Sequence, residues 1–209
     1  VQDQVLHAWS LTVQGQAAQA AGDHHRAAAL FDRALPAARK GGNRSVVALS
    51  LTGAAASAAV LGDMVRGPAW VDEAVATWRT IGSTWGLALA LLVSARLAWG
   101  GRDVGTAGRW CRESLSLVRQ LGDRHGLARG LELLAAVETA SDPAAAARSL
   151  GTAARLRDRL PAPAPPDVRA DLDRLAADLR NRLGAEAFDR EWAAGTGDER
   201  GQSSPAPRH

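Results

Sequence analysis

The chain has 209 residues, is 46% hydrophobic but only 4% aromatic, and carries a formal net charge of +3. Alanine and leucine dominate while β-branched and aromatic strand formers are sparse, so the composition favours an all-α protein. The modest charge, the lack of a signal peptide or a membrane-spanning apolar run, and the single Cys111 predict a cytoplasmic protein that contacts neither membrane nor, directly, nucleic acid.

Residues that end one helix and start the next recur at regular intervals along the first 160 residues. Most are a glycine followed by Asp, Asn or Ser, which suits a helix end and the cap of the following helix. The marks are Gly22-Asp23, Gly42-Asn43, Gly62-Asp63, Gly82-Ser83, Arg102-Asp103, Gly122-Asp123 and Ser141-Asp142. They predict helices over about 3–21, 24–40, 44–61, 67–81, 84–99, 104–121, 124–140 and 143–160.

When the chain is aligned on itself with a shift of forty residues, small residues align with small residues and leucines align with leucines. We call each set of aligned residues a column. Small residues let two helix axes approach closely, and leucines fill the groove beside them. The small columns are Gly15, Ala55, Ala95 and Ala135; Ala27, Gly67, Ala107 and Ala147; and Ala34, Ala74, Ser114 and Ala154; the leucine column is Leu11, Leu51, Leu91 and Leu131. This pattern predicts helix hairpins that dock on one another.

The offsets between these columns resemble those of tetratricopeptide repeats, which place small residues across two antiparallel helices. The forty-residue unit resembles the longer MalT-like repeats of bacterial signalling ATPases. This resemblance implies a right-handed α-solenoid over residues 1–160, with about four hairpin units at 3–42, 43–82, 83–122 and 123–160.

Two parts of the array depart from the repeat. Pro36 lies inside the second predicted helix, where the other units have Ala76 and Ser116, so we expect a kink or an early helix end there. In the fourth unit Gly151 and Arg155 replace large apolar residues, which makes this hairpin degenerate.

The chain changes in character after residue 160. The proline-rich run 161–166 predicts a short extended connector. Apolar residues at helical spacing follow over 168–183, and a short helix over 185–194 carries Phe188 and Trp192. We expect this helix pair, within residues 161–195, to cap the array, and a disordered tail over 196–209 that starts near Gly195.

The block 145–195 carries a second resemblance. Its segments A-A-A-R-S-L-G-T-A-A-R-L-R-D-R-L and L-R-N-R-L-G-A-E-A-F-D-R-E-W-A-A-G flank the proline-rich break. They resemble the C-terminus of large actinobacterial LuxR-type, AfsR-like and cyclase-linked regulators, in which an NTPase core precedes tetratricopeptide repeats. The resemblance implies that this chain is a piece of such a transcriptional regulator, with its own upstream NTPase or effector domain as a partner.

Catalytic and cofactor motifs are missing from the sequence. No Walker-type phosphate loop is present, and the adjacent His24 and His25 point to different helix faces, unlike a chelating pair. Asp171, Asp173 and Asp178 alternate with arginines, which favours a salt-bridged exposed face over acid–base catalysis. We therefore expect no enzymatic activity, no catalytic residue, no cofactor and no bound metal.

Four of the seven tryptophans fall into two groups. Trp70 and Trp110 share a column with Leu30 and Leu150, and we expect them in the core. In the tetratricopeptide register, a concave groove includes Trp9, Thr12, Gln16, Gln19, Leu49, Thr52, Leu89, Leu92, Arg96, Trp99, Arg129, Glu132 and Ala136. We predict partner binding by Trp9, Thr12, Gln16, Thr52, Arg96, Trp99, Arg129 and Glu132. The alternative is that Trp9 and Trp99 only fill gaps between adjacent hairpins.

Three functions are compatible with this sequence. The first is a non-catalytic protein-interaction or sensor module of a multidomain bacterial transcriptional regulator, which presents its groove to a partner domain or protein. The second is a receptor for a small-molecule inducer that contacts Trp9, Arg96 and Trp99. The third is a self-association scaffold that forms homo-oligomers.

Overall fold

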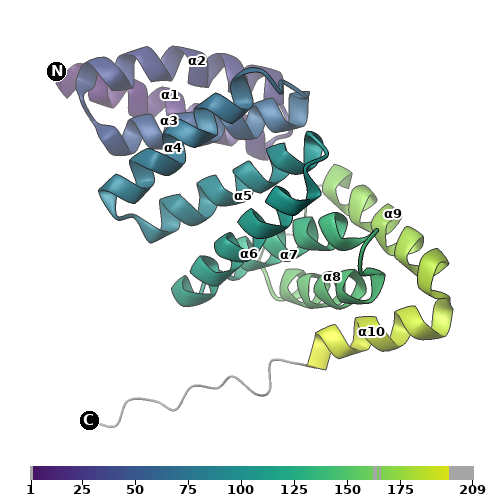
Figure 1. Cartoon of the computed structure of the whole chain (residues 1–209). Coiled ribbons are helices and arrows are strands. Elements are labelled where there is room, and N and C mark those ends of the chain that lie inside the picture. The colour runs from purple at the N-terminus through teal and green to yellow at the C-terminus, as the bar shows by residue number, and fades with distance from the viewer. Residues whose placement is uncertain (1, 162–163, 165, 198–209) are drawn as a thin grey trace, which may run out of the picture. The chain divides into compact units, whose positions relative to one another are not determined.

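The computed structural model describes residues 2–161, 164 and 166–197, and these residues form ten α-helices and no strand (Figure 1). The helices are α1 (Gln2–Ala20), α2 (His24–Gly41), α3 (Arg44–Leu61), α4 (Arg66–Ile81), α5 (Thr84–Gly100), α6 (Val104–Leu121), α7 (Arg124–Glu138), α8 (Pro143–Asp158), α9 (Pro166–Leu183) and α10 (Ala185–Gly197). The prediction of an all-α fold is confirmed. Most of the predicted helix ends agree with these bounds to within two residues.

The chain divides into two compact units, Val1–Leu121 with α1–α6 and Gly122–His209 with α7–α10. Residues 198–209 of the disordered tail predicted over 196–209, and residues 162, 163 and 165 of the predicted connector, lie outside the described residues.

Side-chain caps start the helices at the predicted marks. Asp23, Asn43, Ser83, Asp123 and Asp142 each accept a hydrogen bond from the backbone N–H three residues later, and Asp63 and Asp103 do the same. Each cap satisfies an N–H that the helix itself leaves without a partner, and stabilises the fold by about 1 kcal/mol.

Left-handed residues end most of these helices. Gly22, Gly42, Gly62, Gly82 and Gly122 have φ between 67° and 79°, a region that costs a side-chain-bearing residue free energy. At the equivalent point after α5 the residue is Arg102, with φ of 64°. The turn geometry is therefore kept at a position where the sequence has lost its glycine.

Pro36 does not end α2, so of the two outcomes expected there, a kink or an early helix end, the early end is wrong. The helix continues to Gly41, although Pro36 has no N–H to donate to the preceding turn. Leu35 and Ala38 on either side are buried in the core, so their packing holds the helix together across the missing hydrogen bond.

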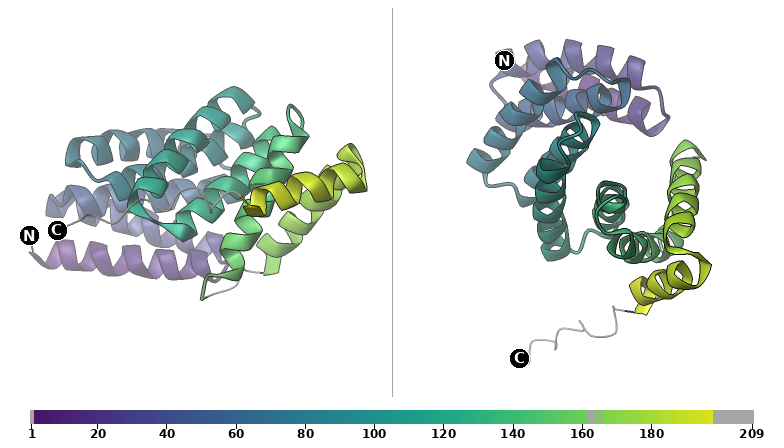
Figure 2. Two further views of the ribbon diagram at one scale, coloured as in Figure 1. Left: turned by 90° about the horizontal axis from the view of Figure 1, so that it is seen from below. Right: turned by 45° about the vertical axis from the view of Figure 1, so that its right-hand side comes forward.

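The first unit consists of three hairpins, α1–α2, α3–α4 and α5–α6, and the second helix of each hairpin packs on the first helix of the next (Figures 1 and 2). The predicted columns form the core: Leu11, Leu51 and Leu91 are at most 4% exposed, and the small residues beside them are buried. The helix α3 is long and apolar enough to cross a membrane by length and composition, but 67% of it is buried inside the protein. Its apolar character therefore reflects its central place among the hairpins.

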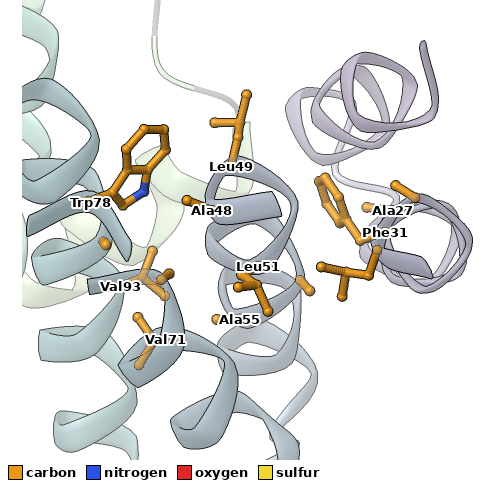
Figure 3. Packing of buried hydrophobic residues seen from close by; sticks show 14 of the residues in the cluster. Ala27, Phe31, Ala48, Leu49, Leu51, Ala55, Val71, Trp78 and Val93 are labelled. Carbon is orange, nitrogen blue, oxygen red and sulfur yellow. The ribbon is translucent and has the colours of Figure 1, made fainter. Parts of the chain in front are cut away.

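Aromatic rings set the distance between these hairpins by occupying the space over glycines. The ring of Phe31, on α2, is fully buried between Gly15 of α1 and Gly53 of α3 (Figure 3). A Cβ at Gly15 would lie 2.8 Å from Cε1 of Phe31, and one at Gly53 would lie closer still. The ring of Trp78, on α4, covers Gly86 of α5 in the same way.

Ion pairs connect the second helices of successive hairpins. The Nη2 atom of Arg39 lies 2.7 Å from Oε2 of Glu73, and that of Arg79 lies 3.4 Å from Oε1 of Glu113. The two arginines are forty residues apart in the sequence, and so are the two glutamates. All four side chains are more than a third exposed, so each pair contributes less than about 1 kcal/mol and acts chiefly on the register of the hairpins.

The second unit contains the hairpin α7–α8 with α9 and α10 packed on it. The core here joins Ala135, Ala146, Leu150, Leu179 and Phe188. In α8 the buried small residues are Ala146, Ala147 and Ala153, whereas the predicted Ala154 is only partly buried. The cause is the α7–α8 turn, in which the capping Asp142 lies thirty-nine rather than forty residues after Asp103 and shifts the register of α8 by one residue.

Glycines bring α8 and α10 into backbone contact. A Cβ at Gly151 would lie 2.5 Å from the carbonyl oxygen of Trp192, and one at Gly195 would collide with the carbonyl oxygen of Arg148. Thr152 Oγ1 donates to the Gly195 carbonyl at 2.7 Å, and Arg148 pairs with Glu191. Gly195 is therefore a buried helical residue rather than the start of the tail, and α10 continues to Gly197 because this contact holds its last turn.

We predict that Gly53→Ala destabilises the protein by roughly 1–3 kcal/mol because its Cβ overlaps the Phe31 ring. Chemical denaturation measures the change. Gly105→Ala is the matched control: Gly105 is also helical but has only Asp103 nearby, so the same substitution should be neutral or stabilise by up to about 1 kcal/mol. Equal losses in both variants would contradict the role of the ring, and Phe31→Leu added to Gly53→Ala should recover part of the loss.

Arg102→Gly should stabilise the protein by about 0.5–1 kcal/mol, because the left-handed backbone then carries no Cβ. The converse change, Gly82→Ala, places a Cβ in the same conformation with open space around it and should destabilise by a similar amount. Thermal unfolding of both variants checks the pair, and a loss of stability in Arg102→Gly would contradict the explanation.

We predict that protonation of two capping aspartates, Asp63 and Asp103, contributes to unfolding in acid. The backbone hydrogen bond from Thr106 lowers the pKa of Asp103, and the backbone hydrogen bond from Arg66 lowers that of Asp63. Groups with a lowered pKa stabilise the fold above their unfolded pKa, near 3.8, and lose that contribution as the pH falls through the folded value.

The melting temperature of Asp63→Asn/Asp103→Asn should therefore fall less steeply than that of the wild type below about pH 4. Asparagine keeps the cap but does not titrate, whereas Asp103→Ala should lower the melting temperature even at neutral pH. Parallel curves for the wild type and the asparagine variant would exclude these two carboxyl groups as a source of acid sensitivity.

Candidate interaction surfaces

The predicted groove residues lie on α1, α3 and α5 of the first unit and on α7 of the second. They differ sharply in exposure. Trp9 is 49% and Trp99 is 42% exposed, Arg96 is exposed, and Gln16 is partly exposed. Leu49, Leu92, Thr12 and Thr52 are buried. Only part of the predicted set is therefore available to a partner.

The two predicted threonines are core residues and lie too deep to contact a partner. Thr12 is fully buried, donates to the Ala8 carbonyl at 2.8 Å, and lies 2.7 Å from Ser50 Oγ on α3. Thr52 is 2% exposed, donates to the Ala48 carbonyl, and accepts from Trp78 Nε1 at 3.1 Å. Their hydroxyls satisfy buried polar groups between helices.

In the second unit, Glu132 is occupied by an internal ion pair. Its two carboxylate oxygens accept from Nε and Nη2 of Arg157 at 2.7 and 2.9 Å, and both side chains are at most 12% exposed. A bidentate pair with so little exposure ties α7 to α8. Arg129 is half-buried and lies one helical turn before Glu132 on α7, one turn after His125. Partial desolvation of the imidazole, followed by the charges of Arg129 and Arg157, lowers the pKa of His125.

Exposed apolar residues that the sequence pattern did not single out lie at the turn that follows Trp99 and at the preceding hairpin turn. Met64 and Val65 belong to the α3–α4 turn, and Met64 packs against Gly100 and Gly101, directly after Trp99. Val65 is 87% exposed, Met64 is 38% exposed, and Val104 at the start of α6 is 47% exposed. We call Met64, Val65, Arg96, Trp99 and Val104 the Trp99 patch. The sequence held one signal for Met64 and Val65: they are two apolar residues at the positions where the first hairpin, forty residues earlier, has His24 and His25.

The other tryptophans support the core. Trp70 and Trp110 are partly buried and pack against the core cluster of the first unit, and Trp78 is 5% exposed within it. Trp85 is 49% exposed and meets Trp78 edge-on, with ring centroids 6.5 Å apart. Cys111 is fully buried.

The described residues contain no cluster of three or more His, Cys, Asp or Glu side chains that could hold a metal ion. A shallow hollow of about 260 Å³ lies between α2, α3 and α4, lined by Arg39, Arg44, Val47, Glu73 and Thr77. This volume is below that of typical small-molecule sites, and none of the predicted groove residues lines it.

No model of a known protein family matches the chain, and no curated protein matches it.

Proposed function

We propose that this chain is a non-catalytic protein-interaction module, a right-handed α-solenoid of tetratricopeptide-like hairpins. In this proposal it is the sensor arm of a multidomain bacterial transcriptional regulator of the signalling ATPase class, located in the cytoplasm. The module holds or releases its own upstream NTPase or effector domain, or another protein. It requires no cofactor and does not bind nucleic acid itself.

The observation that carries this proposal is the Trp99 patch. The column residues of the first unit are buried, yet Trp99, Met64, Val65 and Val104 are exposed at the α3–α4 and α5–α6 turns, and Met64 brings these two turns together by lying close to Gly100 and Gly101. Exposed apolar groups that lie together, with a cation at their edge, are typical of protein-binding surfaces. Arg96 supplies that cation, one helical turn before Trp99 on the same face of α5.

Several features support interaction over small-molecule sensing. Thr12 and Thr52, two of the predicted partner-binding residues, are buried in hydrogen bonds within the core and offer no polar anchor to a small ligand. The Trp99 patch lies at helix ends, outside the hollow between α2, α3 and α4. A partner protein needs an accessible apolar surface of this kind, whereas a small ligand needs enclosure.

The test is affinity capture from an extract of the source organism, compared by quantitative mass spectrometry. Trp99→Ala and Arg96→Ala should each reduce capture of the same partner at least about tenfold, since aromatic and arginine anchors dominate interface energies. Trp85→Ala is the matched control, because Trp85 is 49% exposed, close to the 42% of Trp99, and lies outside the patch. Circular dichroism should show that all three variants remain folded.

Identical captures by all variants and the wild type would contradict the proposal. Quenching or shift of the tryptophan fluorescence by a candidate inducer, lost in Trp99→Ala, would instead favour the small-molecule receptor.

A further inference from the structure

The first hairpin has an open face at the positions that later hairpins use for packing. Leu6, Trp9 and Val13 form a stripe along α1 and are 61%, 49% and 43% exposed. Forty residues later, the equivalent Val46, Leu49 and Gly53 of α3 are all buried. The same helix face is therefore interior in the second hairpin and exposed in the first.

The contacts of these equivalent positions show what they face. Gly53, the counterpart of Val13, packs against the Phe31 ring on α2 of the preceding hairpin. Gly86, the counterpart of Leu6 in the third hairpin, packs against the Trp78 ring on α4. The stripe on α1 is thus positioned to receive a helix, and its exposure shows that none of the described helices covers it.

The second helix of the first hairpin adds a line of cations to this face. Arg26, Arg33 and Lys40 are exposed and lie seven residues apart, which places them along one side of α2. Their counterparts Arg66 and Glu73 on α4 point back to α2, where they pair with Asp32 at 3.5 Å and Arg39 at 2.7 Å. None of the three cations has an ion pair within the described part of the chain.

We propose that this open face, formed by Leu6, Trp9, Val13, Arg26, Arg33 and Lys40, binds an amphipathic helix of a partner protein whose apolar stripe is bordered by carboxylates. The apolar residues of α1 take the partner's apolar stripe, and the cations of α2 pair with its acidic border. The inference rests on the proposed interaction function but uses a surface separate from the Trp99 patch.

Charge argues against a second copy of this chain as the occupant. A copy stacked head to tail would present the α6 residues Arg112 and Arg119, the counterparts of Asp32 and Arg39, to this face. Cations would then meet Arg26 and Arg33, and like charges at an interface suppress that pairing.

The probe is a fluorescein-labelled synthetic helix of about 20 residues with leucines at i, i+3 and i+7 and glutamates along one border. A second peptide carries lysine in place of each glutamate. Fluorescence anisotropy against the full chain should show binding of the acidic peptide, weaker at high salt, and at least about tenfold weaker binding of the basic one.

Variants of the chain then locate the site. Trp9→Ala should weaken binding of the acidic peptide at least about tenfold, and Arg33→Glu should weaken it while strengthening binding of the basic peptide. Trp99→Ala is the matched control and should leave the affinity unchanged. Leu6→Ser provides a second apolar variant if Trp9→Ala proves unstable.

Three results would overturn this inference: the chain does not bind the acidic peptide, it binds both peptides equally, or Arg33→Glu does not shift its affinity from the acidic towards the basic peptide. So would a concentration-dependent dimer in sedimentation that Trp9→Ala abolishes, since that result identifies a second copy as the occupant. None of these results affects capture through the Trp99 patch, so failures of the two proposals are distinguishable.

Discussion

The spacing of the first three hairpins depends on aromatic rings that pack directly on glycines of the neighbouring helices. Phe31 fills the volume between α1 and α3 only because Gly15 and Gly53 have no Cβ, and Trp78 does the same over Gly86. The buried leucines and alanines adapt to this spacing, as do the hydroxyls of Thr12 and Ser50, which meet at 2.7 Å between the same two helices. Close packing makes such a contact unforgiving, because interiors have few voids to absorb an added methyl group.

Local chemistry made most of the helix ends predictable. A capping Asp, Asn or Ser and a left-handed glycine act within a few residues of the chain, and they occur at nearly every turn of the array. Predictions failed where distant residues decide the outcome. Tertiary packing carries α2 through Pro36, and the contact with Arg148 keeps Gly195 helical. A single residue missing from the α7–α8 turn shifted the columns of α8.

The candidate surfaces were harder to predict for a related reason. Periodicity identifies a helix face but not the neighbour that covers it, so Trp9 and Thr12 on α1 were grouped together although one is exposed and the other fully buried. Glu132 was grouped with them because its partner Arg157 lies on another helix, twenty-five residues away. Met64 and Val65 were missed because they lie in a turn, where helical periodicity carries no information.

The backbone contact between α8 and α10 bears on how this protein can change in evolution. In a protein built of stacked hairpins each hairpin contacts only its neighbours, so an added hairpin needs a free helix face to dock on. Since Gly151 and Gly195 already bring α10 against α8, that face has no room for another hairpin. A hairpin inserted between α8 and α9 would separate α10 from its contact with α8. A hairpin inserted among α1–α6 would instead repeat the contact between successive hairpins, which the chain already makes twice.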